Sequence, residues 1–456
     1  MTINDGMQRS EVAMKKILLI LFIFAFIVGI NGAVSAQISS QVAGKCLTCH
    51  KEISTGLYNQ WYESQHAFHK VTCIDCHGAE EGDKDAFMHE GALIATLVTP
   101  GDCGRCHQKE ASEVQNSYHA TAGLILDSQD AYLAHVAGGH PVAIAGCESC
   151  HGARVKIDSE SPNKLAAESW PNSGIGRINP DGTKGACNAC HTRHAFAKSQ
   201  ARQPEACSKC HLGPDHPQKE VYEESKHGNA YYTHKEDMNV NSDSWVVGID
   251  YFEANTCATC HMSATPKQPA SHDVGQRIAW TLRPIISEHK DDWQQKRLNM
   301  KDVCTACHTK TFYDGHFYQF DALVRLYNEK FARPAWDIIK KIQDKNLLEN
   351  KASFSNKIEW TFWELWHHEG RRARHGASMM GPDYTWWHGI YEVAQHFYFK
   401  FLPEARKYND PDVNNYINNM IANDPMHAWL NRPTEEIKKD IRSGKMQEIY
   451  DALFEN

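Results

Sequence analysis

Apolar side chains recur at helical spacing in the last third of the chain. One such face is carried by Ile358, Phe362, Leu365 and Trp366, and another by Ile390, Val393 and Phe397. Positions i, i+4, i+7 and i+8 lie on one side of an α-helix, so both patterns predict helices. Asp410 followed by Pro411 is typical of a helix N-terminus. We therefore predict a helical C-terminal domain over residues 311–456, which also makes the subunit contacts.

The N-terminal residues have a different pattern. Two lysines precede a short apolar run at 17–30, and small residues follow at 34–36. This order is typical of a secretory signal peptide. We predict that residues 1–36 are an extension and a signal peptide, with Met14 as the natural start and the mature chain beginning near Gln37. An uncleaved N-terminal anchor is the alternative, although the run is short for a membrane span.

The remaining chain contains no stretch that is apolar for the length of a membrane span. Its net charge of −8 argues against nucleic acid, which requires a basic surface. We expect an exported protein of the periplasm or an equivalent compartment.

The cysteines carry the strongest chemical signal. All 16 lie in eight Cys-x-x-Cys-His motifs. The motifs are Cys46-Cys49-His50, Cys73-Cys76-His77, Cys103-Cys106-His107, Cys147-Cys150-His151, Cys187-Cys190-His191, Cys207-Cys210-His211, Cys257-Cys260-His261 and Cys304-Cys307-His308.

Disulfides, zinc sites and a thioredoxin-like motif are the alternatives. Disulfides and zinc sites do not require a histidine after each pair, and a thioredoxin-like motif would occur once. Histidine makes up about 6% of the chain, so chance would place one after all eight pairs with a probability of about 10^-10. We therefore predict eight covalently bound haem c groups. The two thiols bond the haem edge, and the following histidine binds the iron as its axial ligand.

Other histidines can fill the second axial position of each iron. Eight haems need about seven such distal ligands if one iron stays open for substrate. Our candidates are His66, His89, His119, His140, His194, His227 and His272, with His69, His135 and His234 as alternatives to three of them.

The motif spacing is irregular, so a solenoid of equal repeats is not expected. The segments between motifs are too short to build an ordinary core, and 41% of the chain is hydrophobic. We predict a mainly α fold in which short helices and loops over residues 37–310 surround closely stacked haems. The polar stretch at 155–185 is rich in Gly and Pro and predicts a loop.

Three stretches resemble the octahaem hydroxylamine oxidoreductase family, within a likeness that covers roughly residues 40–400. They are CSKCHLGPDHPQ at 207–218 with SKHG at 225–228, CATCHMSAT at 257–265 with SHDVG at 271–275, and MMGPDY at 379–384 with WHG at 387–389.

The resemblance implies a homotrimer with a catalytic haem at the fourth motif, on Cys147, Cys150 and His151, that lacks a distal protein ligand. It implies that Asp215 and His216 face the substrate. A carboxylate and an imidazole suit this role, because oxidising hydroxylamine removes protons along with electrons. A capped turn with a surface histidine is the structural alternative.

The resemblance also implies roles for tyrosines. A tyrosine after the eighth motif completes the pocket, and we expect Tyr313, with Tyr318 as the alternative. In oxidising members a tyrosine of a neighbouring subunit is bonded to the catalytic haem. We expect Tyr384 in this role, with Tyr391 next. Packing in an aromatic-rich helix explains either residue equally well.

Three functions follow from these residues. The first is oxidation of hydroxylamine, or its relative hydrazine, with electrons passed to a redox partner cytochrome. The second is reduction of nitrite or hydroxylamine to ammonia on the same fold. The third is a non-catalytic electron conduit, which would need no proton acceptor and would leave no iron open.

Overall fold

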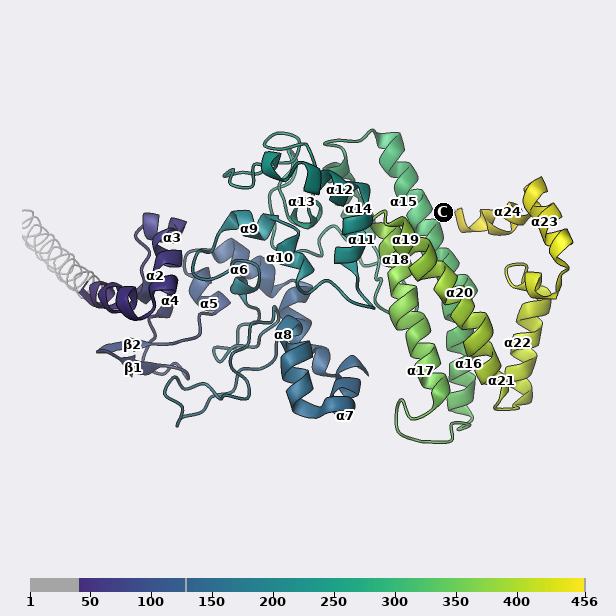
Figure 1. The fold of residues 1–456 in the computed structure, drawn as a ribbon, viewed down its shortest axis with the longest axis horizontal. Helices are drawn as coiled ribbons and strands as arrows, with labels where there is room; N and C mark the ends of the chain where they lie inside the picture. The colour runs from purple at the N-terminus through teal and green to yellow at the C-terminus, as the bar shows by residue number, and fades with distance from the viewer. Residues whose placement is uncertain (1–40, 128, 455–456) are drawn as a thin grey trace, which may run out of the picture.

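The computed structural model describes residues 41–127 and 129–454, and this part of the chain is mainly α-helical (Figure 1). The predicted extension and signal peptide lie outside the described residues. A single small hairpin in the described part pairs β1 (Phe87–His89) with β2 (Ala92–Ile94), with Phe87 opposite Ile94. The predicted mainly α fold is confirmed. None of the described helices combines the length and the apolar character of a membrane span.

Short helices and loops make up the part of the chain that holds the cysteine motifs. The α-helices are α2 (Thr55–Tyr62), α3 (Gln65–Phe68), α4 (Cys73–His77), α5 (Pro100–Gly104), α6 (Gln108–Gln115), α7 (Gln129–Val142), α8 (Glu148–His151), α9 (Lys198–Arg202), α10 (Glu205–Ser208), α11 (Gln218–Glu224), α12 (Lys226–Thr233), α13 (Cys257–His261) and α14 (Trp293–Cys304). Between them lie η1 (Tyr118–Asp127), η2 (Ala143–Cys147), η3 (Cys187–Ala189) and η4 (Lys235–Asp237).

Threonine caps set the start of several motif helices. Thr72 precedes α4 and Thr256 precedes α13, so in both cases the first cysteine is the first helical residue. The Thr256 hydroxyl accepts a hydrogen bond from the backbone of Thr259, which satisfies a donor that the helix end leaves unpaired. Residues i and i+3 of a helical turn lie on the same face. One turn is therefore enough to present both thiols of a motif to the same bound group.

The C-terminal part consists of long helical runs interrupted by π-type segments (Figure 1). The first run is α15 (Lys310–Tyr327), η5 (Asn328–Ala332) and α16 (Arg333–Asp344), and the second is α17 (Lys357–Trp363), η6 (Glu364–Gly370) and α18 (Arg371–Ser378). The third run is α19 (Pro382–Thr385), η7 (Trp386–Tyr391), α20 (Glu392–His396), η8 (Phe397–Phe401) and α21 (Leu402–Arg406). After it come α22 (Pro411–Asn423), η9 (Ala428–Asn431), α23 (Thr434–Ser443), α24 (Lys445–Asp451) and η10 (Ala452–Phe454).

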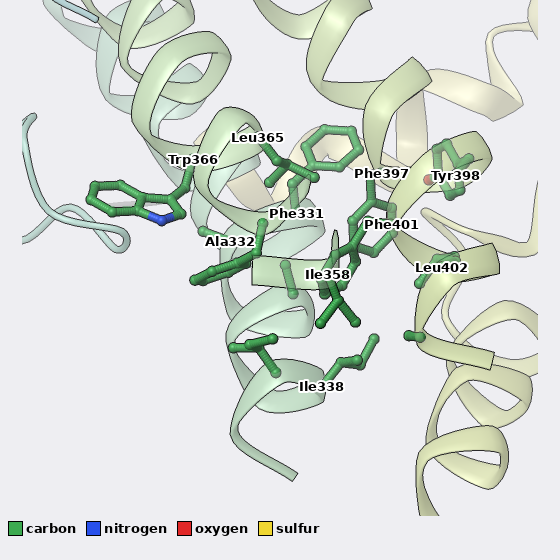
Figure 2. Packing of buried hydrophobic residues seen from close by; sticks show 14 of the residues in the cluster. Phe331, Ala332, Ile338, Ile358, Leu365, Trp366, Phe397, Tyr398, Phe401 and Leu402 are labelled. Atoms are coloured by element: carbon green, nitrogen blue, oxygen red, sulfur yellow. The ribbon is translucent and has the colours of Figure 1, made fainter. Parts of the chain in front are cut away.

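The largest apolar core lies between these helical runs (Figure 2). The predicted apolar faces point into it, with Ile358, Leu365 and Phe397 fully buried. Asp410 caps α22 as predicted, because its carboxylate accepts hydrogen bonds from the backbone of Asp412 and Val413. This core holds the second helical run in place. The last helix of that run, α18, packs against α11 of the motif region.

The predicted loop at 155–185 contains no helix in the structure and is organised around a buried arginine. Arg177 donates from Nε to Asn179 at 2.7 Å and from Nη2 to the carbonyl of Val98 at 2.8 Å. Because a buried guanidinium needs several acceptors, these bonds fix the loop against the segment before α5.

Candidate functional site

No disulfide joins any two of the sixteen cysteines, all of which lie in the described part of the chain. Across residues 41–127 and 129–454, no group of three or more His, Cys, Asp or Glu side chains is arranged to hold a metal ion directly. The motif thiols are therefore available to bond another group.

A cavity of about 3660 Å³ runs through the motif region. Pockets for a single small molecule are about 300–1,000 Å³, so this cavity is large enough for several large groups. Residues of the second to the eighth motif line it, among them Cys76, Cys103, Cys150, Cys187, Cys207, Cys257 and Cys304.

Six motif histidines each face a second histidine at nearly the same separation. The ring centroids are 6.1–6.4 Å apart in the pairs His50–His89, His66–His107, His77–His194, His119–His211, His191–His272 and His227–His308. Two imidazoles bonded to one iron from opposite faces, each at about 2 Å as in other metal–imidazole bonds, would place their centroids about 6 Å apart. The residues therefore fit haem, and this separation supports our proposal that six of the predicted histidines are distal ligands.

Backbone contacts orient several of the motif histidines. The Nδ1 atom of His77 lies 2.9 Å from the carbonyl oxygen of Ala95. His191 and His261 also hydrogen-bond the backbone, at Ala197 and Val274. A carbonyl bound at Nδ1 leaves Nε2 as the free ligand atom, which is how iron-binding histidines are usually held.

The seventh predicted distal ligand, His140, is exposed on α7 and is not part of the cavity lining. The alternatives His69, His135 and His234 are exposed as well. His316, which the sequence patterns did not single out, lines the cavity from α15 beside Phe317 and Phe320. In the sequence of a long amphipathic helix, a histidine that faces a cavity looks the same as a histidine on the solvent-exposed polar face.

Thiols of different motifs meet at three places in the structure. Side-chain hydrogen bonds join Cys103 with Cys187, Cys207 with Cys257, and Cys150 with Cys210. Groups bonded to the two thiols of each pair would be close neighbours.

Asp215 and His216 lie in the segment between α10 and α11 and line the cavity. Arg371, the first residue of α18, donates from Nη1 to Oδ2 of Asp215 at 3.0 Å. The other carboxylate oxygen, Oδ1, lies 3.5 Å from Nε2 of His216. Both side chains of the arginine–aspartate pair are largely buried, with exposed fractions of 11% and 16%. The aspartate is therefore oriented by a buried ion pair, which differs from the surface turn considered from the sequence.

More imidazoles surround this pair. His367, His368 and His375 come from the sequence HHEGRRARH at 367–375 and line the same cavity. Burial holds the pKa of His375 far below its usual value, and Arg374 acts in the same direction. Burial also lowers the pKa of His368. Sequence reasoning missed this group, whose signal was an unusual density of His and Arg within an aromatic-rich helix.

The predicted tyrosines lie in different surroundings. Tyr313 lines the cavity, with its hydroxyl 3.4 Å from Oγ1 of Thr305, whereas Tyr318 is exposed and packs against Phe454. Tyr384 is half-buried outside the cavity lining, where its ring lies against His388.

The neighbourhood of Tyr384 is a surface rich in exposed aromatic rings. Burial, followed by the carboxylate of Glu220, raises the pKa of Tyr384. The exposed aromatic side chains near it in η7 are Trp386, Trp387 and Tyr391.

Comparisons with known proteins agree with this chemistry. The family described as "Seven times multi-haem cytochrome CxxCH" matches residues 178–354. A probable nitrite reductase–hydroxylamine oxidoreductase fusion protein of Kuenenia stuttgartiensis is 25% identical over 372 residues, which are 67% of this chain and 38% of that protein. The chain thus spans well under half of the length of this relative.

Two solved structures share the fold. A hypothetical multihaem protein has a TM-score of 0.70 at 24% identity, over 83% of this chain and 96% of the other. A reducing HAO-like protein complex of Kuenenia stuttgartiensis has a TM-score of 0.61 at 19% identity, over 84% of this chain and 88% of the other.

Proposed function

We propose that this chain is a multihaem c-type cytochrome of the hydroxylamine oxidoreductase type, and that it binds eight haems and oxidises hydroxylamine, or its relative hydrazine. We further propose that it is an exported homotrimer and that its electrons leave to a redox partner cytochrome. The observation that carries the enzymatic proposal is the buried ion pair between Asp215 and Arg371 beside His216.

Cys147, Cys150 and His151 would hold the catalytic haem, which would supply the electron-accepting chemistry for the substrate. The protein side chains have a separate task, which is to receive protons. Asp215 and His216 lie 3.5 Å apart with their polar atoms directed at each other, and both line the cavity. A carboxylate and an imidazole can both accept protons near neutral pH.

Arg371 keeps Asp215 in place for this task. Its Nη1 atom binds the carboxylate at 3.0 Å, and its Nε atom donates to the carbonyl of Arg283 at 2.8 Å. Two donors on one planar guanidinium restrict its rotation, so the carboxylate has a fixed direction. A conduit that only passes electrons has no use for such an arrangement.

Imidazoles beside the pair add groups that can exchange protons with it. Burial lowers the pKa values of His368 and His375. An imidazole can accept or donate a proton, so these rings serve oxidation and reduction alike. We place oxidation first because the description of the fusion relative includes a hydroxylamine oxidoreductase.

Reduction of nitrite or hydroxylamine to ammonia is the second candidate. The fusion relative supports this candidate, since its description includes a nitrite reductase. Direction is tested by mixing anaerobic oxidised protein with hydroxylamine or hydrazine, and reduced protein with nitrite, while following haem absorption. Fast reduction by hydroxylamine with slow oxidation by nitrite supports our proposal, and the opposite result supports the reductase.

Asp215→Asn provides the matched test of the site. Loss of the substrate-driven reaction in this variant, with haem content unchanged, ties the reaction to Asp215. Asp250→Asn is the control, because Asp250 lies at the surface in hydrogen bonds with Ser244 and Val246. A parent protein that reacts with none of the three compounds and binds no small ligand at any iron would support the conduit instead.

A further inference from the structure

The π-type segment η6 lies between α17 and α18, where the second helical run passes the cavity. Such segments are rare and often occur at functional sites, because the wider turn changes the direction of side chains. Here it gives Glu364, His367 and His368 different surroundings. The two histidines line the cavity, whereas Glu364 is 48% exposed at the outer surface.

The inner end of this group reaches the proposed acid–base pair. Nε2 of His367 lies 3.9 Å from Oδ2 of Asp215. The rings of His367 and His368 meet edge to face, with centroids 5.3 Å apart. Asp215 itself is largely buried, so a proton that it receives has little direct access to solvent.

The outer end of the group is a carboxylate in contact with water. Burial, followed by His367, lowers the pKa of His368, and the charges of Asp215 and Glu364 act against this effect. Glu364 and His368 are four residues apart in one helical segment, so they lie on the same side of it. Glu364 is also held 3.5 Å from Nε2 of buried His396.

His396 is itself fixed from its other side. Its Nδ1 atom lies 2.7 Å from Oε1 of Glu369, and both side chains are buried. The Glu364 carboxylate thus has a fixed partner on the protein side and solvent on the other.

We propose that His367, His368 and Glu364 form a proton-relay that connects Asp215 to bulk water. The relay rests on the proposed oxidation of hydroxylamine. When hydroxylamine loses an electron pair and becomes nitroxyl, two protons leave it, and the electrons pass to the partner cytochrome. Each proton moves from Asp215 through the two imidazoles to Glu364 and then to water, and each group returns to its starting protonation state.

The relay is distinct from the ion pairs beside it. Arg371 is held by Asp215 and by the carbonyl of Arg283, and Arg372 is held by Glu392. A guanidinium group does not give up its proton in proteins, so it cannot relay one. The imidazoles and Glu364 offer a route that these arginines cannot.

The test compares Glu364→Gln and His368→Phe with the parent protein, all fully loaded with haem. Stopped-flow mixing with hydroxylamine follows haem reduction by absorption and proton release by a pH-sensitive dye. We expect proton release to slow by about tenfold or more in both variants, with the substrate concentration for half-saturation unchanged. Added imidazole buffer should restore the rate of proton release in His368→Phe. A merely structural defect would not respond to added buffer.

The control is Glu349→Gln, which removes an exposed carboxylate remote from the cavity lining. Native proton release in Glu364→Gln and in His368→Phe would overturn the relay. So would slow release in both variants that external buffer fails to change.

A second measurement separates the relay from the proposed function. After a rapid pH jump on protein with azide bound to the open iron, the haem spectrum of the parent should follow the new pH faster than that of Glu364→Gln. If hydroxylamine fails to reduce the parent but the two pH-jump rates differ, the proposed oxidation of hydroxylamine fails and the relay stands. Equal pH-jump rates would reject the relay whatever the substrate.

Discussion

Arg371 and Asp215 form a buried ion pair between the start of α18 and the segment before α11, with Nη1 and Oδ2 3.0 Å apart. The pair joins the helical C-terminal part to the cavity that the cysteine motifs line. It therefore affects both the stability of this contact and the chemistry of the site.

Replacing Arg371 should weaken both properties. Arg371→Gln leaves the Asp215 carboxylate buried without its charged partner, which costs about 3–5 kcal/mol in comparable buried pairs. We expect a lower free energy of unfolding in urea and slower substrate-driven haem reduction, with partial recovery in Arg371→Lys. Arg333→Gln is the control, because its partner Glu329 is at the surface and such pairs contribute about 0–1 kcal/mol. Equal losses in the two Gln variants would contradict the buried-pair argument.

Removing the Asp215 carboxylate should affect chemistry more than folding. Asp215→Asn keeps the size of the side chain, and we expect the rate of hydroxylamine-driven haem reduction to fall by about 10²–10⁴. Binding of azide to an open iron should be nearly unchanged, since azide is already an anion near neutral pH and needs no proton acceptor. A variant that keeps the parent rate would remove Asp215 from the proposed mechanism.

Axial ligation can be tested by comparing two histidines. The ring centroid of His66 lies 6.2 Å from that of the motif residue His107, whereas His140 is exposed on α7. We expect His66→Ala to open one iron, which electron paramagnetic resonance reports as a new high-spin signal that shifts with azide. His140→Ala should leave the spectrum unchanged. A new high-spin signal in His140→Ala would restore the prediction made for this residue from the sequence.

Replacing Tyr384 tests whether neighbouring chains are cross-linked through a haem. On a denaturing gel stained for haem, we expect the parent from its native host to remain trimeric and Tyr384→Phe to run as single chains. Tyr391→Phe tests the alternative candidate in the same helical run, and Tyr62→Phe, which changes an exposed tyrosine of α2, is the control. Single chains in the parent would remove the cross-link and favour nitrite reduction.

His427 should make stability depend on pH. Burial lowers the pKa of His427 to about 4 from the ordinary 6.5, and its Nδ1 lies 2.9 Å from the hydroxyl of Tyr398. The unfolded chain binds a proton below about pH 6.5 that the folded chain does not bind until about pH 4. The stabilising effect of the neutral ring is therefore complete above pH 6.5 and is lost as the pH falls towards 4.

The measurement is urea unfolding from pH 7 to pH 4. The parent should lose stability more steeply than His427→Gln, by up to about 1.4 kcal/mol per pH unit. Exposed His388 supplies the control variant His388→Gln, which should keep the slope of the parent. Parallel curves for the parent and His427→Gln would show that His427 titrates normally.

The sequence by itself determined the features that depend on adjacent residues. A Cys-x-x-Cys-His motif fits on one helical turn, so its chemistry can be read without knowing the fold. The apolar face through Ile358 and Leu365 likewise follows from helical spacing, and both residues are buried as that spacing predicts.

The tertiary structure decided which distant residues meet. Asp215 and Arg371 are 156 residues apart, and no local pattern indicates that they form an ion pair. His66 and His140 both read as plausible distal ligands, but the fold places one of them opposite a motif histidine and the other at the surface. Local spacing sets which face of its own element a side chain occupies, whereas the packing of whole elements sets what that face meets.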